Sequence, residues 1–274
     1  MSFTEELFSV KNKVCVLTGG GGVLAGAIGE GLAKAGAKVA LLDIRLENAQ
    51  KRVDIIRQNG GIAFAYETNV LELSALEKTQ IKINQELGLI DVLINLAGGN
   101  MPGASIMPDQ TIFDLKKDDF EKVMQLNING TVYPTMVFSK DMAKTRKGCI
   151  INISSMAAYR AISRQLGYSA AKAAVSNFTR WMAMDMGMKF GEGIRVNALA
   201  PGFFIGDQNR ALLINEDGSY TDRGKTVIAN TPLQRFGEPE ELIGAIIYLI
   251  SDAAKFVTGV ILPIDGGFEA FSGV

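Results

Sequence analysis

The chain has 274 residues, of which 47% are hydrophobic, enough for the core of one large α/β domain. Its 28 basic and 29 acidic residues leave a net charge of −1 without a basic block, which argues against a nucleic-acid partner. The absence of histidine excludes Ser-His-Asp and Cys-His catalysis and most zinc sites, so we predict no metal. Any general acid or base therefore has to be Tyr, Lys, Asp or Glu.

The sequence shows no segment that predicts secretion or membrane insertion. Its first residues, MSFTEELFSVKNK, carry two glutamates and lack the apolar stretch of a signal peptide. The apolar run 242–250 is far shorter than the roughly 20 residues that span a bilayer. Cys15 and Cys149 each lie inside an apolar run, which favours two reduced core thiols, with a disulfide as the alternative. We therefore predict a cytoplasmic protein without a membrane partner.

Short apolar runs alternate with longer helical patterns along the chain. The apolar runs cover residues 13–18, 38–43, 62–66, 91–96, 149–154, 194–199 and 259–264. The helical patterns cover residues 25–36, 46–59, 73–87, 118–145, 167–190 and 239–252. Apolar strands separated by helices predict a parallel sheet that is covered on both faces. Since no repeat or linker interrupts this pattern, we predict an α/β fold: one Rossmann-type domain, residues 1–274, with a doubly wound parallel sheet of about seven strands.

The first apolar run ends in a glycine-rich turn, Thr18 to Gly26, that leads into a helical pattern. Such a turn lets the backbone approach a pyrophosphate, whose charge sits at the helix N-terminus. Asp43 ends the second run, where a carboxylate can bind the adenosine ribose and repel a 2′-phosphate. The pattern therefore predicts NAD rather than NADP. Arg45 could moderate the repulsion, and a helix N-cap is the alternative role for Asp43.

Tyr168 and Lys172 form the pair with the clearest chemistry. Residues four apart share a helix face, so the ammonium can lie beside the phenol and favour the phenolate. A tyrosine with a lowered pKa can take a proton from an alcohol or return one to an alkoxide. None of the other five tyrosines has a lysine at this spacing, and Ser155 lies thirteen positions before Tyr168. The alternative is an ordinary helix with a packed tyrosine and a surface lysine.

Two stretches interrupt the alternation, Gly98 to Leu115 and Pro201 to Pro239, and both contain prolines. Each follows the C-terminal end of a predicted strand, which is the edge at which open α/β sheets bind ligands. We predict that these segments form the substrate pocket. Disordered surface insertions are the alternative.

These motifs together resemble the short-chain dehydrogenase/reductase family, from about Lys11 to Phe268, and they occur in the order typical of that family. The further matching motifs are Asn95-Leu96-Ala97-Gly98, Leu126-Asn127-Ile128-Asn129-Gly130, Ser154-Ser155, Arg195-Val196-Asn197, Pro201-Gly202 and Asp265-Gly266-Gly267. The resemblance implies a homotetramer, or sometimes a dimer, with the helices at 118–145 and 167–190 in an interface. Met182, Met184, Met186 and Met188 would suit that packing, or could fill the core.

The resemblance also implies roles for single residues. Tyr168 would be the acid/base, Lys172 would lower its pKa and hold the nicotinamide ribose, and Ser155 would bind the substrate oxygen. Asn127 would hold a water that links Lys172 to solvent. The implied cofactor contacts are Gly19, Gly21, Gly22, Val23, Leu24, Asp43, Asn69, Val70, Asn95, Ala97, Gly98, Tyr168, Lys172, Pro201, Gly202 and Ile205.

The chain departs from the family pattern in its glycine turn and in one nicotinamide contact. The three family glycines align with Gly19, Val23 and Ala25, so two of them are substituted. Gly206 stands where a threonine commonly contacts the nicotinamide amide, a contact that the backbone of Ile205 could make. These changes bear on cofactor contacts rather than on the class of cofactor.

A finer pattern resembles the D-mannonate oxidoreductases, or fructuronate reductases, of this family. It is carried by TGGGGVLAGAIG, NLAGGNMPGAS, PGFFIGDQNRALLINEDGS and PIDGGFEAFSGV. The resemblance implies interconversion of D-mannonate and D-fructuronate. A sugar acid needs a cation for its carboxylate and polar groups for its hydroxyls. The candidates are Asn100, Arg160, Arg164, Gln208, Asn209 and Arg210, with solvated surface arginines as the alternative.

Two other functions stay open at this point. One is a reductase of the same family for another keto-sugar acid, a polyol or a 3-oxoacyl group on a carrier. The other is a non-catalytic dinucleotide sensor or scaffold. The complete set of Asn127, Ser155, Tyr168 and Lys172 argues against a silent protein.

Overall fold

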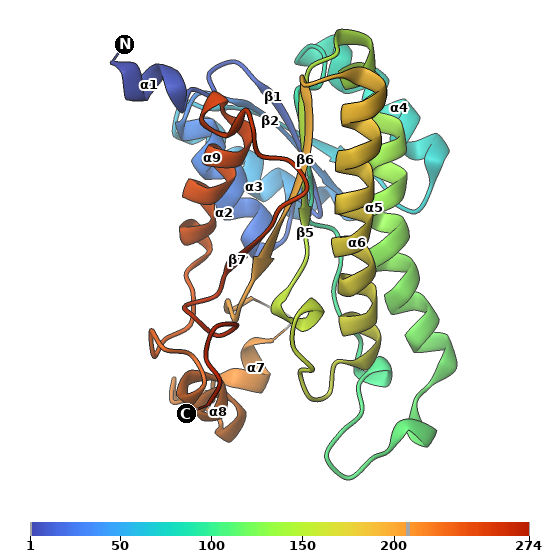
Figure 1. The fold of residues 1–274 in the computed structure, drawn as a ribbon, viewed down its shortest axis with the longest axis vertical. Helices are drawn as coiled ribbons and strands as arrows, with labels where there is room; N and C mark the ends of the chain where they lie inside the picture. The colour runs from blue at the N-terminus through green and yellow to red at the C-terminus, as the bar shows by residue number, and fades with distance from the viewer. Residues whose placement is uncertain (1, 207–208, 274) are drawn as a thin grey trace.

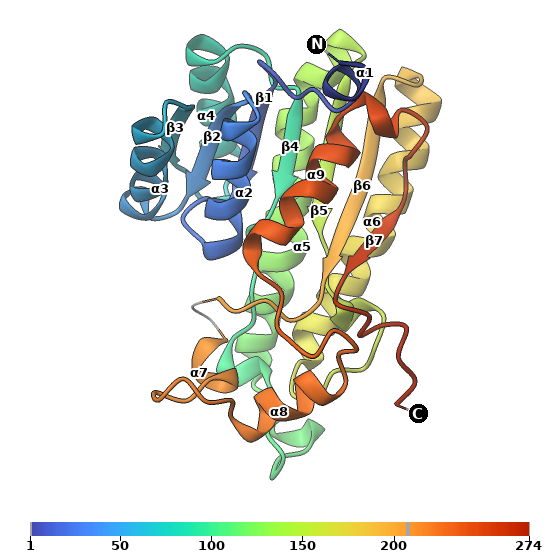
Figure 2. The ribbon, with the colours of Figure 1, turned by 90° about the vertical axis from the view of Figure 1, so that its left-hand side faces the viewer.

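The computed structural model describes residues 2–206 and 209–273. One parallel sheet runs through it (Figure 1), and its strand order, β3-β2-β1-β4-β5-β6-β7, can be followed in Figure 2. The strands are β1 (Val14–Thr18), β2 (Lys38–Asp43), β3 (Ile62–Glu67), β4 (Val92–Asn95), β5 (Gly148–Ile153), β6 (Ile194–Pro201) and β7 (Ile261–Ile264). The predicted fold class, a single Rossmann-type domain with a doubly wound sheet of seven strands, is confirmed.

Helices cover both faces of this sheet (Figure 1). One face carries α2 (Val23–Lys34), α3 (Leu46–Gln58) and α9 (Ile243–Ile250), which share an apolar core with it. The other face carries α4 (Leu73–Glu86), α5 (Lys117–Thr145) and α6 (Leu166–Phe190), which share a second core. The short α1 (Phe3–Leu7), capped by Ser2, is the one helix before the sheet and lies outside the predicted patterns. Burial on both faces explains why the strands are continuous apolar runs rather than alternating ones.

The C-terminal ends of the strands are aligned, and they carry the polar residues. Thr18 pairs with Leu42 on β2 and with Asn95 on β4, and Asn95 pairs in turn with Asn152 on β5. Because the strands are parallel and in this register, the segments that follow them all emerge at one edge of the sheet. That edge is where the glycine turn and the Ser155 segment begin.

A buried chain of amide and hydroxyl groups ties the sheet to α5 and α6. The Asn95 amide donates to Asn152 Oδ1 at 2.8 Å and to Thr135 Oγ1 of α5 at 3.1 Å. The Asn152 amide donates to Thr179 Oγ1 of α6 at 2.9 Å. These side chains are all buried, so each bond also avoids the cost of a polar group without a partner. The two helices that carry Asn127 and Tyr168 are thereby fixed against the centre of the sheet.

The two segments expected to be loops contain short helices. The first holds 3-10 turns at Pro102–Ala104 and Ile112–Asp114. The second holds α7 (Arg210–Leu213) and α8 (Asp222–Ala229). Its described part has an apolar cluster of its own, formed by Leu213, Val227 and Phe236 with Phe203, Ile205, Ile214 and Ile228 packed against it. With only eight residues, α8 is too short for its periodicity to stand out in the sequence.

The sulfur-containing residues divide between core and surface. Cys15 and Cys149 are buried free thiols, as predicted. Met182 and Met186 are buried in the core of the α5–α6 face, whereas Met184 and Met188 are 52% and 81% exposed. The four methionines therefore do not act as one group: alternate residues of α6 point to the core and to the surface. Within the described residues, the helices fall short of the length and apolar character that crossing a bilayer requires.

Two glycines near the end of α6 allow a test of the packing. A Cβ added at Gly193 would overlap the carbonyl oxygen of Arg146, whereas one added at Gly187 would meet nothing within 4 Å. A backbone atom cannot move aside as a side-chain end can, so we expect Gly193→Ala to lower the free energy of unfolding by about 1–3 kcal/mol. Gly187→Ala should raise it by about 0.5–1 kcal/mol, since alanine favours the helix. Urea unfolding measures both changes, and equal losses would contradict this packing.

Candidate active site

Three elements converge on Gly98 at the carboxyl edge of the sheet. A Cβ added at Gly98 would lie 2.6 Å from Asn127 Oδ1 of α5 and 3.3 Å from Lys172 Nζ of α6. The buried Asn127 amide donates to the carbonyls of Gly99 and Val123 at 2.8 Å each, and its oxygen accepts from the Gly99 N–H at 3.2 Å. The segment after β4 is thus fastened to α5, and only glycine leaves room for the lysine beside it.

Lys172 is an almost fully buried amine. It is 4% exposed, and its Nζ donates to the carbonyl oxygen of Ile153, at the end of β5, at 2.8 Å. Its Nζ lies 5.4 Å from the centre of the Tyr168 ring, so the two side chains share a face as their spacing predicts. Burial lowers the pKa of Lys172 to about 8, because the low-dielectric surroundings disfavour the ammonium.

The pKa of Tyr168 differs from the sequence-based expectation. Burial raises the pKa of the Tyr168 phenol, and a hydrogen bond with the Ser155 hydroxyl opposes that rise without cancelling it. The lowered pKa that we expected from Lys172 is therefore wrong for the protein alone. Desolvation of the phenolate outweighs the neighbouring amine, which itself is driven towards its neutral form by burial.

The two consecutive serines have different surroundings. Ser155 Oγ accepts from the Ala157 N–H at 3.2 Å at the start of a 3-10 turn, which leaves its O–H free to donate. Ser154 is buried, with its Oγ 2.6 Å from Ser176 Oγ. Ser155, rather than Ser154, therefore faces the phenol. A hydroxyl, a phenol and an amine in one place can move a proton to or from a carbinol oxygen.

The glycine turn lies against Asp43. The carboxylate accepts from the Gly21 N–H through Oδ2 and from the Arg45 N–H through Oδ1, at 3.0 Å each. Arg45 is itself the N-cap of α3, so the alternative role of Asp43 as a helix N-cap is wrong. Gly22 is the N-cap of α2, and as a glycine it has no side chain that could bond the first N–H groups of the helix. The turn therefore offers uncapped backbone N–H groups beside a carboxylate whose orientation is fixed.

The other predicted cofactor positions lie along the same edge. The Thr18 hydroxyl accepts from the N–H groups of Leu96 and Ala97 at 3.1 Å each, which holds Ala97 beside the turn. Sequence reasoning missed this role of Thr18, although a threonine at a strand end before glycines was a usable signal. The Gly202 N–H donates to Ile264 at 2.9 Å where β6 ends at Pro201.

Residues 69 and 70 lie in the turn between β3 and α4. The Asn69 oxygen accepts from the Leu71 N–H at 3.0 Å, and its amide donates to Glu72 at 2.8 Å. Val70 is buried, and an added Cβ at Gly130 would lie 3.3 Å from its Cγ2. The Asn69 side chain thus shapes the turn between β3 and α4.

The predicted substrate residues differ in what they already bind. Asn100 donates to Ser105 Oγ at 3.0 Å, while its Oδ1 is buried and has no hydrogen-bond partner among the described residues. Arg160 forms an ion pair with Glu269 at 3.7 Å and also donates to the carbonyl of that residue. The side-chain amide of Asn209 accepts a hydrogen bond from the Gly206 N–H and donates one to the carbonyl oxygen of Phe204, so it stabilises its own loop.

The remaining candidates come from the turn before α6 and from the second segment. Arg164 is partly buried just before α6, and Arg210 is exposed at the start of α7. Gln208 lies outside the described residues. Sequence reasoning missed Arg223 of α8, which donates to both the hydroxyl and the carbonyl of Ser163 at 3.1 Å each. These two residues are sixty positions apart in the chain, so no local signal connects them.

The buried amine predicts an unusual dependence of stability on pH. A lysine whose pKa is lowered to about 8 disfavours folding below that pH, and the penalty disappears as the pH rises towards the ordinary value of 10.5. We expect Lys172→Met to raise the melting temperature at pH 7, with a gain that shrinks between pH 8 and 10.5. Lys189→Met, at an exposed position of the same helix, is the control and should show no such trend. A gain independent of pH would contradict a desolvated ammonium.

The chain is similar to known proteins over its whole length. Residues 22–269 match the family model described as enoyl-(acyl carrier protein) reductase. An uncharacterized oxidoreductase of Haemophilus influenzae is 45% identical, with 100% of both chains covered, and the uncharacterized oxidoreductase UxuB of Bacillus subtilis is 43% identical, with 97% of this chain and 98% of that one covered.

A solved structure is also similar. It is a Haemophilus protein described as a candidate D-mannonate oxidoreductase with bound NAD. It superposes with a TM-score of 0.91 at 45% identity, over 99% of this chain and 100% of that one. The family match and the full-length relatives agree with the site geometry described above. The chain is an oxidoreductase that belongs to the short-chain dehydrogenase/reductase family.

Proposed function

We propose that the protein is an NAD-dependent enzyme that interconverts D-mannonate and D-fructuronate. The observation that carries the reaction type is the meeting of Ser155, Tyr168 and Lys172 at the sheet edge that also holds the glycine turn. The substrate and the cofactor are supported by the similar structure, which is described as a candidate D-mannonate oxidoreductase with bound NAD.

The residues of the glycine turn fit a nicotinamide dinucleotide. The uncapped N-terminus of α2 suits a pyrophosphate, and the fixed Asp43 carboxylate suits the ribose hydroxyls. When bound there, such a cofactor supplies the hydride that reaches the carbonyl carbon. The same fit extends to Ala97 and Gly98, which lie between the turn and Lys172.

The protein's own residues supply the proton. Ser155 donates its free O–H to the substrate oxygen and positions it. Tyr168 gives its phenolic proton to that oxygen during reduction and takes it back during oxidation. The raised pKa of Tyr168 keeps the phenol protonated and ready to donate. The charged form of Lys172 favours the phenolate in the reverse direction. Lys172 and Asn127 complete the path by which Tyr168 regains its phenolic proton from solvent.

The substrate end is formed by the two segments after β4 and β6. Asn100 Oδ1 suits a sugar hydroxyl. It is a buried acceptor without a hydrogen-bond partner among the described residues, and a donated hydrogen bond would remove the cost of leaving it unpaired.

The proposal also includes a cytoplasmic homotetramer with α5 and α6 at an interface. The exposed Trp181, Met184 and Met188 of α6 support that interface.

Replacement of the acid/base tests catalysis directly. We expect Tyr168→Phe to lower kcat for D-fructuronate reduction by about 10²–10⁴-fold, because the proton donor is lost, while the Kd for NADH changes little. Tyr159→Phe is the matched control, since its hydroxyl donates to the carbonyl oxygen of Ile261 on β7. A silent dinucleotide-binding protein would bind NADH but give no turnover in any of the three proteins.

A substrate panel tests the specific assignment. NADH oxidation is measured with D-fructuronate, 5-ketogluconate, a deoxy-keto uronate and an acetoacetyl thioester. We expect the highest kcat/KM with D-fructuronate. Efficient turnover of another compound without D-fructuronate turnover would replace the substrate but leave the reaction type.

Cofactor choice depends on the charge of Asp43. We expect the enzyme to prefer NADH to NADPH, and Asp43→Asn to reduce the ratio of the two kcat/KM values by about tenfold, because the repulsion of a 2′-phosphate is lost. Glu67→Gln is the control: this exposed acid pairs with Asp43 in the sheet register but lies at the end of the next strand. A ratio that falls equally in both variants would point to general surface charge rather than to Asp43.

A further inference from the structure

Arg223 holds the turn that precedes the catalytic helix. Its two terminal nitrogens donate to the hydroxyl and the carbonyl of Ser163, at 3.1 Å each. Ser163 and Arg164 lie between Ser155 and Tyr168, whereas Arg223 comes from α8 in the segment after β6. A guanidinium that binds one residue at two points fixes both its position and its orientation. The conformation of Arg164 therefore depends on a contact between the turn before α6 and the segment after β6.

Arg164 has a backbone conformation that arginine rarely adopts. Its φ is 70°, in the left-handed region that favours glycine and costs other residues about 1–3 kcal/mol. Leu166 begins α6, so Arg164 lies in the turn two residues before that helix and four residues before Tyr168. A residue kept in a strained turn beside the acid/base is expected to serve the ligand rather than the fold.

The two arginines bring positive charge together without a carboxylate. Within residues 2–206 and 209–273, neither Arg164 nor Arg223 takes part in an ion pair. Arg223 binds Ser163, the residue before Arg164, at two points, so the two cations lie close to each other. Burial and the charge of Arg164 both lower the pKa of Arg223. An anion between or beside them would relieve this repulsion.

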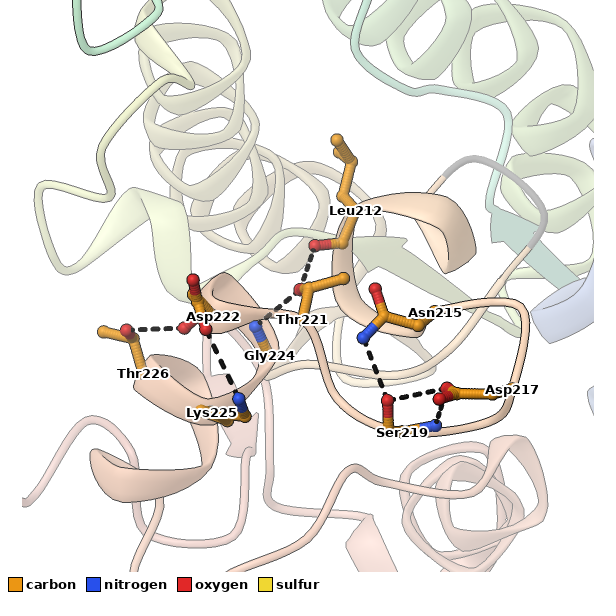
Figure 3. A network of polar contacts seen from close by, with 9 residues as sticks. All are labelled: Leu212, Asn215, Asp217, Ser219, Thr221, Asp222, Gly224, Lys225 and Thr226. Atoms are coloured by element: carbon orange, nitrogen blue, oxygen red, sulfur yellow. Dashed lines mark hydrogen bonds and ion pairs between the residues drawn. The ribbon is translucent and has the colours of Figure 1, made fainter.

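The acidic neighbour of Arg223 is directed elsewhere. Asp222 binds Lys225 at 3.3 Å, and its carbonyl accepts from Thr226 at 2.8 Å (Figure 3). Thr221 caps α8 by accepting from the Gly224 N–H at 3.0 Å, and it donates to Leu212 at 2.7 Å. This network stabilises α8, and Arg223 on that helix binds Ser163 in the turn before α6.

We propose that Arg164 binds the carboxylate of the sugar acid and that Arg223 is the positioning residue that holds it there. This inference rests on the proposed function and assigns the carboxylate site within it. In D-fructuronate the ketone and carboxylate carbons are four C–C bonds apart, about 5 Å in an extended chain. A carboxylate so near the ketone has to be bound by a side chain near Tyr168, and Arg164 lies only four residues before it. Arg160 is engaged by Glu269, so it is the weaker candidate.

The test compares each acid with the ketose in which a hydroxymethyl group replaces the carboxylate. The pairs are D-fructuronate with D-fructose and 5-ketogluconate with L-sorbose. We expect the wild-type enzyme to favour an acid over its neutral partner in kcat/KM. Arg164→Met should raise KM for that acid by about 10- to 150-fold, the range of hydrogen bonds to a charged group, with kcat and the Kd for NADH little changed.

Two further variants separate binding from folding. Arg164→Gly removes the side chain and the backbone strain together, so it should raise the melting temperature while raising KM for the acid as much as Arg164→Met does. Arg223→Lys keeps the charge but cannot bind Ser163 at two points, so we expect an intermediate rise in KM with kcat retained. A merely structural role for Arg223 would instead lower stability and kcat together.

Lys189→Met is the control, because it removes one positive charge from an exposed position outside the α8 network. We expect it to leave KM for both acids unchanged. If the wild type reduces an acid but Arg164→Met and Arg164→Gly keep its preference over the neutral ketose, the carboxylate site is elsewhere and only this inference fails. If the wild type reduces neither acid, the proposed sugar-acid function fails as well.

Discussion

In this protein a primary amine, Lys172 Nζ, is held almost out of water at the carboxyl edge of the sheet. The position is costly, as the lowered pKa of about 8 indicates. One backbone carbonyl, that of Ile153 at the end of β5, accepts its hydrogen bond. The surroundings follow from this contact: the neighbouring segment needs glycine at position 98, and α5 has to present the Asn127 amide at the same point. Sheet, loop and both helices are therefore fitted to one buried nitrogen.

Such a fit requires that the helices cannot slide along the sheet. Apolar packing alone tolerates small shifts, because it has no preferred direction. The buried chain from Asn95 through Asn152 to Thr179 does have direction, since each amide must meet its acceptor. It joins the centre of the sheet to the helix that carries Tyr168 and Lys172. The polar core thus sets the register that the site needs, and the apolar core supplies most of the stability.

Features that depend on local spacing could be predicted from the sequence, whereas features that depend on distant contacts could not. The strands followed from apolar runs, and the proximity of Tyr168 and Lys172 followed from helix periodicity. The raised pKa of Tyr168 did not, because burial depends on what the whole fold places around the phenol. The same holds for Arg223, whose partner Ser163 is sixty positions away, and for α8, which is too short for a clear periodic signal.

The site combines a fixed end with an end set by surface segments. At one end, Tyr168 and the buried Lys172 lie on the long helix α6, whose position is determined by the core. The far end depends on α8 and on the turn before α6, which meet through Arg223 and Ser163. A change in the second segment would alter the position of Arg164 without moving Tyr168. The contact of Arg223 with Ser163 is separate from the bond of Asn152 to Thr179, which holds α6. In the proposed function, this separation lets the distance from the proton donor to the recognised carboxylate change without any change in the core.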